Sequence, residues 1–266
     1  MRLLLVSGFV LALLRSANAE LPPPNQAGVT MGHIHLNVRD VEIQKRFWIE
    51  QFGATPFKRG DLQGVKLPDG MLILLRKQIP VGGSEGCVLD HFGFKVPNIA
   101  KALDGIRSAG GTVQRELKGT EGTKNAFFVG PDDLKLEFQE DPSLTLKSIG
   151  YHLHYQLVPP VPLRDWYVKT FSMGSRKRGQ IDSADVPGMS LSFSPTKEPA
   201  FPMKGRVIDH VGFEVKNLEA FCKKLEASGV KLDVPYKKGP KHGFATAFLT
   251  DPSGVYIELT EGLDKF

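Results

Sequence analysis

One pattern occurs four times along this chain: a short segment in which apolar and polar residues alternate, with a histidine on the polar side. In the clearest copy, Val211 and Phe213 alternate with His210 and Gly212. A period of two is typical of a β-strand with one face in the core. Six of the seven histidines lie in the four copies, which are residues 31–38, 89–96, 150–157 and 208–215.

The copies are evenly spaced, which indicates an internal repeat rather than four unrelated strands. The corresponding histidines are 58, 61 and 58 residues apart, at His33, His91, His152 and His210. Each copy is followed by a run with helical periodicity and then by short strand-like runs separated by turn signals. The helical runs are residues 41–52, 99–109, 163–171 and 218–227. The predicted unit is a strand, a helix and about three further strands, so the predicted class is α+β.

This unit, with a histidine in its first strand and the sequence DPSGVYIEL (251–259) near its end, resembles the vicinal oxygen chelate superfamily. That superfamily includes glyoxalase I, fosfomycin-resistance and bleomycin-resistance proteins, and extradiol dioxygenases. The resemblance implies four βαβββ modules that pair into two cupped, mixed β-sheet domains with helices on the outer faces. The modules are predicted at residues 30–80, 86–142, 148–200 and 205–262, which gives a first domain of residues 30–142 and a second of residues 148–262.

In this superfamily the metal ligands come from the first and last strands of the modules. The last strands of the second and fourth modules offer Glu137 and Glu258, whereas the matching positions of the other modules hold Leu74 and Ser192. The resemblance thus implies two sets of two imidazoles and one carboxylate. Modules paired in chain order give His33, His91 and Glu137 in one set and His152, His210 and Glu258 in the other. An exchanged pairing gives His33, His210 and Glu258 in one set and His152, His91 and Glu137 in the other.

Two imidazoles and one carboxylate suit borderline divalent metals, and non-haem iron(II) oxygenases use this donor set with positions left open. We therefore expect a divalent metal ion as cofactor, with Fe²⁺ favoured and Mn²⁺, Zn²⁺ and Ni²⁺ as alternatives. Leu74 cannot coordinate a metal and Ser192 is a poor donor. The fourth protein ligand that glyoxalase I enzymes supply at this position is therefore missing, which leaves room for substrate oxygens.

Three further histidines are candidates for acid–base catalysis. His35 and His154 lie two residues beyond the first histidine of their strands, about 6.5–7 Å along the same face, which suits a group that acts on a metal-bound substrate. Each can instead orient the neighbouring ligand or replace it. His242 lies in a glycine-rich loop, in the region where extradiol dioxygenases carry a catalytic histidine. The tyrosine that those enzymes carry ten residues before the ligand Glu is Phe248 here.

The predicted function is that of an exported, metal-dependent enzyme with dioxygenase-type chemistry on a small substrate with vicinal oxygens. One alternative is a lyase, isomerase or transferase of the glyoxalase or fosfomycin type. Another is a non-catalytic protein that binds a small molecule. The predicted cavity lining is apolar with one cation in the first module, at Leu72, Leu74 and Arg76, and small and polar in the third, at Ser190, Ser192 and Ser194. Because the two linings differ, one site is expected to be catalytic and the other a relic.

The N-terminus has the pattern of a secretory signal peptide. Arg2 precedes an apolar run at 3–14, and Ala17-Asn18-Ala19 is a small-residue cleavage site, which predicts export after cleavage behind Ala19. Residues 20–29 contain three consecutive prolines and are predicted to be an extended leader. No later segment is long and apolar enough to span a membrane.

Charge and cysteine content limit the partners. Without residues 1–19 the chain has 34 − 2 = 32 basic and 29 acidic residues, a net charge of +3 with no long basic block. Nucleic-acid binding therefore has no support in the sequence. Cys87 and Cys222 occupy unlike positions of the repeat, which predicts two buried free thiols. The expected partner is a small-molecule substrate, and the expected state is a monomer or homodimer.

Overall fold

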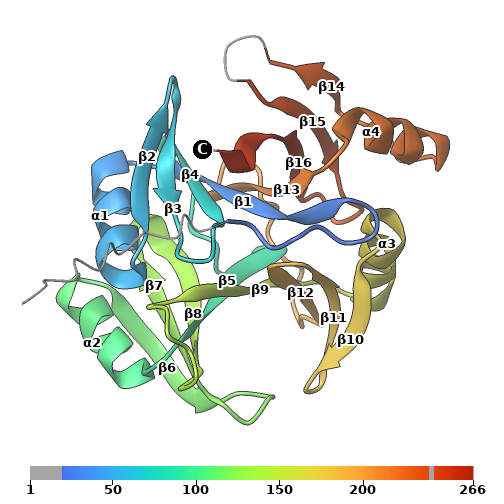
Figure 1. Ribbon diagram of the computed structural model, residues 1–266. Helices are drawn as coiled ribbons and strands as arrows, with labels where there is room; N and C mark the ends of the chain where they lie inside the picture. The colour runs from blue at the N-terminus through green and yellow to red at the C-terminus, as the bar shows by residue number, and fades with distance from the viewer. Residues whose placement is uncertain (1–19, 240–242, 266) are drawn as a thin grey trace, which may run out of the picture.

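The computed structural model describes residues 20–239 and 243–265. The predicted signal peptide (1–19) and the candidate His242 lie outside the described residues. Within them, two eight-stranded mixed sheets and four α-helices give the predicted α+β fold (Figure 1). None of the helices in these ranges is both long and apolar enough to cross a membrane.

The first sheet combines strands from the two ends of the chain. Its order is β14 (Val234–Lys238), β15 (Ala245–Thr250), β16 (Tyr256–Glu261), β13 (Ile208–Val215), β1 (Val29–Val38), β4 (Leu72–Lys77), β3 (Leu62–Lys66) and β2 (Thr55–Arg59). In the centre, β1 is antiparallel to β13 and parallel to β4. This sheet therefore joins the first module to the fourth.

The second sheet repeats the same arrangement with the middle of the chain. Its order is β10 (Gly174–Arg178), β11 (Ile181–Val186), β12 (Met189–Ser194), β9 (Ile149–Gln156), β5 (Leu89–Val96), β8 (Leu134–Glu140), β7 (Lys124–Gly130) and β6 (Thr112–Lys118). Here β5 is antiparallel to β9, so the second module joins the third. The exchanged pairing is the one that the chain adopts. Each sheet contains strands from both residues 30–142 and residues 148–262. The division of the chain into two domains at these bounds therefore stays a prediction.

The helices begin and end where the sequence predicts, within two residues. They are α1 (Val41–Phe52), α2 (Ile99–Ser108), α3 (Val161–Phe171) and α4 (Leu218–Ala227), with short 3-10 helices η1 (Pro131–Asp133) and η2 (Leu263–Lys265). Asp40 caps α1 by accepting hydrogen bonds from the backbone N–H groups of Glu42 and Ile43, at 2.8 and 3.0 Å. Gly53 ends the helix with φ = 75°, a left-handed conformation that glycine adopts without steric cost.

One hydrophobic core lies on the faces of the two sheets opposite the histidines. On that side the ring of Trp48 from α1 stacks on Phe92 of the second sheet, with ring centroids 5.9 Å apart. Phe171 from α3 packs 5.0 Å from Phe213 of the first sheet. All four side chains are fully buried. α1 and α3 pack on strands of their own modules, and these two aromatic contacts also join each helix to the other sheet across the core.

The remaining predictions about the chain outside the sheets hold in part. Cys87 and Cys222 are buried and free, as predicted. The leader has no regular structure as far as Asn25, but β1 begins at Val29, inside the predicted leader range. Asn25 fixes this segment because its side-chain amide donates hydrogen bonds to the carbonyl oxygens of Phe171 and Ser172, at 2.9 and 3.1 Å.

Candidate metal centres

The first sheet brings together His33, His210 and Glu258, which we call the β1/β13 centre. One carboxylate oxygen of Glu258, Oε2, lies 3.0 Å from Nε2 of His33 and 3.0 Å from Nε2 of His210. All three side chains are buried, and their donor atoms lie within 4.8 Å of one another. This is one of the two sets that the exchanged pairing predicts.

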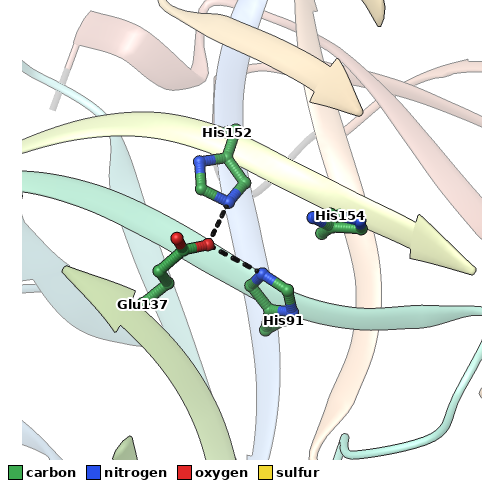
Figure 2. Close-up of side chains that lie close together, drawn as sticks. All are labelled: His91, Glu137, His152 and His154. Atoms are coloured by element: carbon green, nitrogen blue, oxygen red, sulfur yellow. Dashed lines mark hydrogen bonds and ion pairs between the residues drawn. The ribbon is translucent and has the colours of Figure 1, made fainter. Parts of the chain in front are cut away.

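The second sheet brings together the other predicted set, His91, Glu137 and His152, and adds His154. We call these four residues the β5/β9 centre (Figure 2). Oε2 of Glu137 lies 3.1 Å from Nε2 of His91 and 2.9 Å from Nε2 of His152. Of the two candidate acid–base residues in the described ranges, His154 thus lies inside a cluster of donors, whereas the equivalent His35 lies outside one.

Two glycines make room for the histidines. In the register of the first sheet, His33 faces Gly212, which faces Glu258 on the next strand. A Cβ at Gly212 would lie 1.9 Å from a ring carbon of His33, and a Cβ at Gly93 would lie 2.1 Å from a ring carbon of His152. Because glycine has no side chain, the imidazole lies across its backbone and reaches the carboxylate on the strand beyond.

Two aspartates fix the other imidazoles, and the sequence analysis missed both. In β13, Ile208 and His210 face the adjacent residues Leu36 and His35, so Asp209 is the extra residue of a β-bulge. Nδ1 of His210 donates a hydrogen bond of 2.7 Å to Asp209. The equivalent bond from His91 to Asp90 is 2.5 Å. The signal for these partners was the dipeptide Asp-His, which opens the second and fourth copies of the repeat and is absent from the other two.

The electrostatics of both centres call for a positive charge between the donors. Burial alone would raise the pKa of Glu258, but hydrogen bonds from His210 and His33 hold it well below its usual range. Burial likewise opposes charge on His210, yet bonds to Asp209 and Glu258 raise its pKa. With Nδ1–H committed to Asp209, the lone pair of Nε2 faces a carboxylate oxygen, an arrangement that a proton or a metal ion resolves. The buried His and Glu side chains therefore fit a divalent metal.

A cavity of about 250 Å³ adjoins the β1/β13 centre. Its wall is lined by His35, Leu62, Leu74, Arg76, Asp209, His210, Phe244, Phe248, Tyr256, Glu258 and Leu263. Leu72, Leu74, Phe244 and Leu263 form a small apolar cluster apart from the main core. Arg76 donates to Asn37 and Asp209, at 2.7 and 2.5 Å. Of the three side chains predicted to line it, Leu74 and Arg76 do so and Leu72 does not, and polar side chains share the wall with them.

Tyr256 brings a phenol to this cavity. It lies two residues before Glu258, and not at position 248, where the resemblance to extradiol dioxygenases implies a tyrosine. Its ring stacks on Phe248 with centroids 5.0 Å apart and lies 6.0 Å from the ring of His210. Burial raises the pKa of Tyr256, helped by nearby carboxylates. Burial also lowers the pKa of His35 to about 3, helped by the neighbouring His210. At neutral pH the cavity therefore offers a neutral phenol and a neutral imidazole.

The corresponding region of the second sheet is polar, as predicted from its serines. Ser192 accepts a hydrogen bond of 3.1 Å from Nη1 of Arg178, whose side chain is almost fully buried. The guanidinium also lies over the ring of Tyr151 and 3.2 Å from Glu121. A larger surface groove of about 830 Å³ beside Trp166 includes none of the clustered donors, so volume alone does not locate the chemistry.

Comparisons with known proteins agree with this architecture. Glyoxalase I from Zea mays superposes with a TM-score of 0.70 at 16% identity, over 89% of this chain and 94% of that one. A candidate dioxygenase from Bacillus subtilis superposes with a TM-score of 0.64 at 15% identity, over 87% of this chain and 85% of that one. At these identities the likeness concerns the fold alone. No match was found among curated proteins.

The family model described as Glyoxalase/Bleomycin resistance protein/Dioxygenase superfamily matches residues 30–138 and 163–259. The two matched stretches include five of the six predicted metal ligands, and the sixth, His152, lies between them. With the repeat, the four modules and the buried donors in agreement, the chain belongs to the glyoxalase, bleomycin-resistance protein and dioxygenase superfamily.

Proposed function

We propose that this protein is a metal-dependent enzyme that performs dioxygenase-type chemistry on a small substrate with vicinal oxygens, and that the β1/β13 centre is its active site. The observation that carries the proposal is the combination of three buried protein donors with an adjoining cavity. Catalytic metal sites keep a position open for substrate in this way. A metal ion held by His33, His210 and Glu258 supplies Lewis acidity and, when it is iron(II), the capacity to activate oxygen.

The residues around the centre suit a planar, oxygen-bearing substrate. Phe248 and Tyr256 form a stacked aromatic wall, and Leu74 lies on the same cavity. An aromatic ring gains by packing against such a wall. The neutral imidazole of His35 can accept a hydrogen bond from a substrate hydroxyl, and the neutral phenol of Tyr256 can donate one.

Leu74 also bears on the reaction class. It sits beside His35 in the register of the sheet, on the side away from His210. An alkyl side chain at this position supplies no fourth ligand, which disfavours the site expected from resemblance to glyoxalase I and leaves room for substrate oxygens. A lyase or isomerase remains the second candidate because His35 and Tyr256 also serve proton transfer without oxygen.

The experiment is oxygen uptake by metal-free protein reloaded with Fe²⁺ and supplied with a panel of catechols. We expect oxygen consumption that matches product formed. Glu258→Gln should lower turnover by more than ~100-fold, because the neutral amide gives up the anionic ligand, and Glu137→Gln should lower it far less. Turnover without oxygen uptake would move the protein to the lyase or isomerase class. No turnover with any metal would overturn the proposal of an enzyme.

Export, which rests on the residues of the predicted signal peptide, bears on the metal. Outside the cytoplasm Zn²⁺ and Cu²⁺ compete for nitrogen and oxygen donors through their higher intrinsic affinity. Metal analysis of protein purified from its natural compartment therefore distinguishes Fe²⁺, which we favour, from Mn²⁺, Zn²⁺ and Ni²⁺. A zinc-loaded protein that is fully active without oxygen would contradict the dioxygenase assignment.

A further inference from the structure

The two centres arise from the same repeat but gather different numbers of donors. In the described residues the β1/β13 centre has three donor side chains within 4.8 Å, and the β5/β9 centre has four. The additional side chain is His154. Its counterpart His35 holds the same place in the strand register, because each faces the histidine of the antiparallel neighbour, His210 or His91. The difference between the centres therefore lies in how these two rings are held.

Ser194 holds the ring of His154. Nε2 of His154 lies 2.9 Å from the hydroxyl of Ser194, at hydrogen-bonding distance. The other ring nitrogen, Nδ1, is buried and has no hydrogen-bond partner anywhere in the described part of the chain. Such an orphaned polar atom costs stability unless something binds it. In Figure 2 a ring nitrogen of His154 points towards the space between His91 and His152.

The first module lacks this serine. The residue that corresponds to Ser194 in the register is Arg76, which faces Asn37 just as Ser194 faces Gln156. Arg76 is bound to Asn37 and Asp209. His35 instead lies on the wall of the 250 Å³ cavity. One serine in place of one arginine thus accompanies the change from a cavity-lining histidine to a clustered one.

A buried, positively charged side chain lies beside the β5/β9 centre, whereas the β1/β13 centre has a cavity beside it. Ser192 is the neighbour of His154 in the sheet, and Arg178 binds it. The charge of Arg178 is matched by Glu121, which is 3.2 Å away and also accepts a hydrogen bond of 2.9 Å from Tyr151. This network of polar side chains lies beside the donors of the β5/β9 centre.

We propose that His154 is a fourth metal ligand, through Nδ1, and that His91, Glu137, His152 and His154 form a closed metal centre that stabilises the fold. Structural metal sites fill all four positions with protein donors, whereas catalytic sites leave one open. The assignment of turnover to the other centre rests on the proposed function, but the four-ligand centre does not. Zn²⁺ is the ion whose preferred donor number and type this set matches.

The test is a titration of the metal-free, full-length Glu258→Gln variant with Co²⁺, which confines binding to the β5/β9 centre. Four-coordinate Co²⁺ absorbs visible light strongly, and five- or six-coordinate Co²⁺ absorbs weakly. We expect one equivalent with the strong spectrum and a rise in melting temperature. His154→Ala in the same background should weaken the spectrum and lower affinity by more than ~10-fold. His35→Ala, the matched control, should leave both unchanged.

Two outcomes would overturn the proposal: a weak Co²⁺ spectrum in the Glu258→Gln parent, or a strong spectrum and full affinity in His154→Ala. Should His154→Ala fail to fold without metal, Ser194→Ala decides. It keeps the imidazole and removes its anchor, so we expect a measurable loss of Co²⁺ affinity, and full affinity counts against the role of Ser194 and His154. Because the spectrum needs no substrate, failure of the enzymatic proposal leaves this result standing.

Discussion

Replacing Gly212 by alanine should empty the β1/β13 centre while leaving the other centre loaded. The added Cβ would lie 1.9 Å from Cε1 and 2.2 Å from Nδ1 of His33. Carbon atoms in contact sit about 3.5–4.0 Å apart, so the ring has to move by about 1.5 Å or more. Metal–ligand bonds tolerate only ~0.2 Å, and His33 is fully buried, so a shift of its ring has to displace neighbouring atoms of the close-packed interior.

The magnitude follows from these distances. Loss of one ligand from a three-ligand site should lower metal affinity by more than ~100-fold, since disturbing even the partners of ligands costs 10–100-fold. Overpacking should cost about 1–3 kcal/mol of unfolding free energy. The assay is calorimetric titration of metal-free protein with Co²⁺, which should count two sites in the native chain and one in Gly212→Ala.

Two matched variants make the experiment specific. Gly93→Ala should remove the β5/β9 centre instead, because its Cβ would lie 2.1 Å from the ring of His152. Gly174→Ala is the control: this strand glycine has no positive φ, and its nearest neighbour would lie 4.0 Å away, so two sites should remain. Full binding of two metal ions by Gly212→Ala, with an unchanged melting temperature, would refute the reasoning.

Three further predictions concern the core, the pH dependence and the N-terminus. Phe213→Ala should cost about 3–5 kcal/mol in urea unfolding and leave metal affinity per folded molecule unchanged, and metal loss at unchanged stability would place Phe213 on the wrong face. Burial raises the pKa of Glu214 to about 7, so between pH ~4.5 and 7 the folded protein keeps a proton that the unfolded chain releases. The free energy of unfolding should therefore fall as the pH rises from about 4.5 to about 7. Glu214→Gln should flatten that part of the stability profile, and an unchanged slope would contradict it. N-terminal sequencing of the native protein should return Glu20, and Met1 would exclude cleavage.

The fold was predictable because its signals are local and repeated. Alternation in residues 208–215 determines which face of the strand is polar, and the equal spacing of His33, His91, His152 and His210 places four such strands in equivalent modules. A period of two leaves little freedom, since a slip by one residue would bury the histidines in the core and expose Val211 and Phe213. The six donors followed from this register and from the family resemblance, but their grouping into two sets did not.

The pairing of modules was not predictable in the same way. Both pairings give two imidazoles and one carboxylate, so the donor count cannot distinguish them. In the structure the strand pairing distinguishes them, because β1 pairs with β13 and β5 with β9, between segments whose local patterns do not encode a partner. The bulges at Asp90 and Asp209 were also hidden, because a strict alternation assigns these residues to the core face, and the extra residue of a bulge is exempt from it.

The contrast between the two centres shows how few side chains separate a centre with an adjoining cavity from one with a buried arginine beside it. The strand register places Leu74 and Ser192 beside equivalent histidines, and Arg76 and Ser194 one row further. An alkyl group keeps one side of the β1/β13 centre apolar and without hydrogen-bond donors, so a cavity remains there. A hydroxyl at the same place accepts a hydrogen bond from Arg178, whose guanidinium is buried there. Apart from His154 the two centres offer the same donors, so the difference that we propose in their chemistry has to come from these neighbouring side chains.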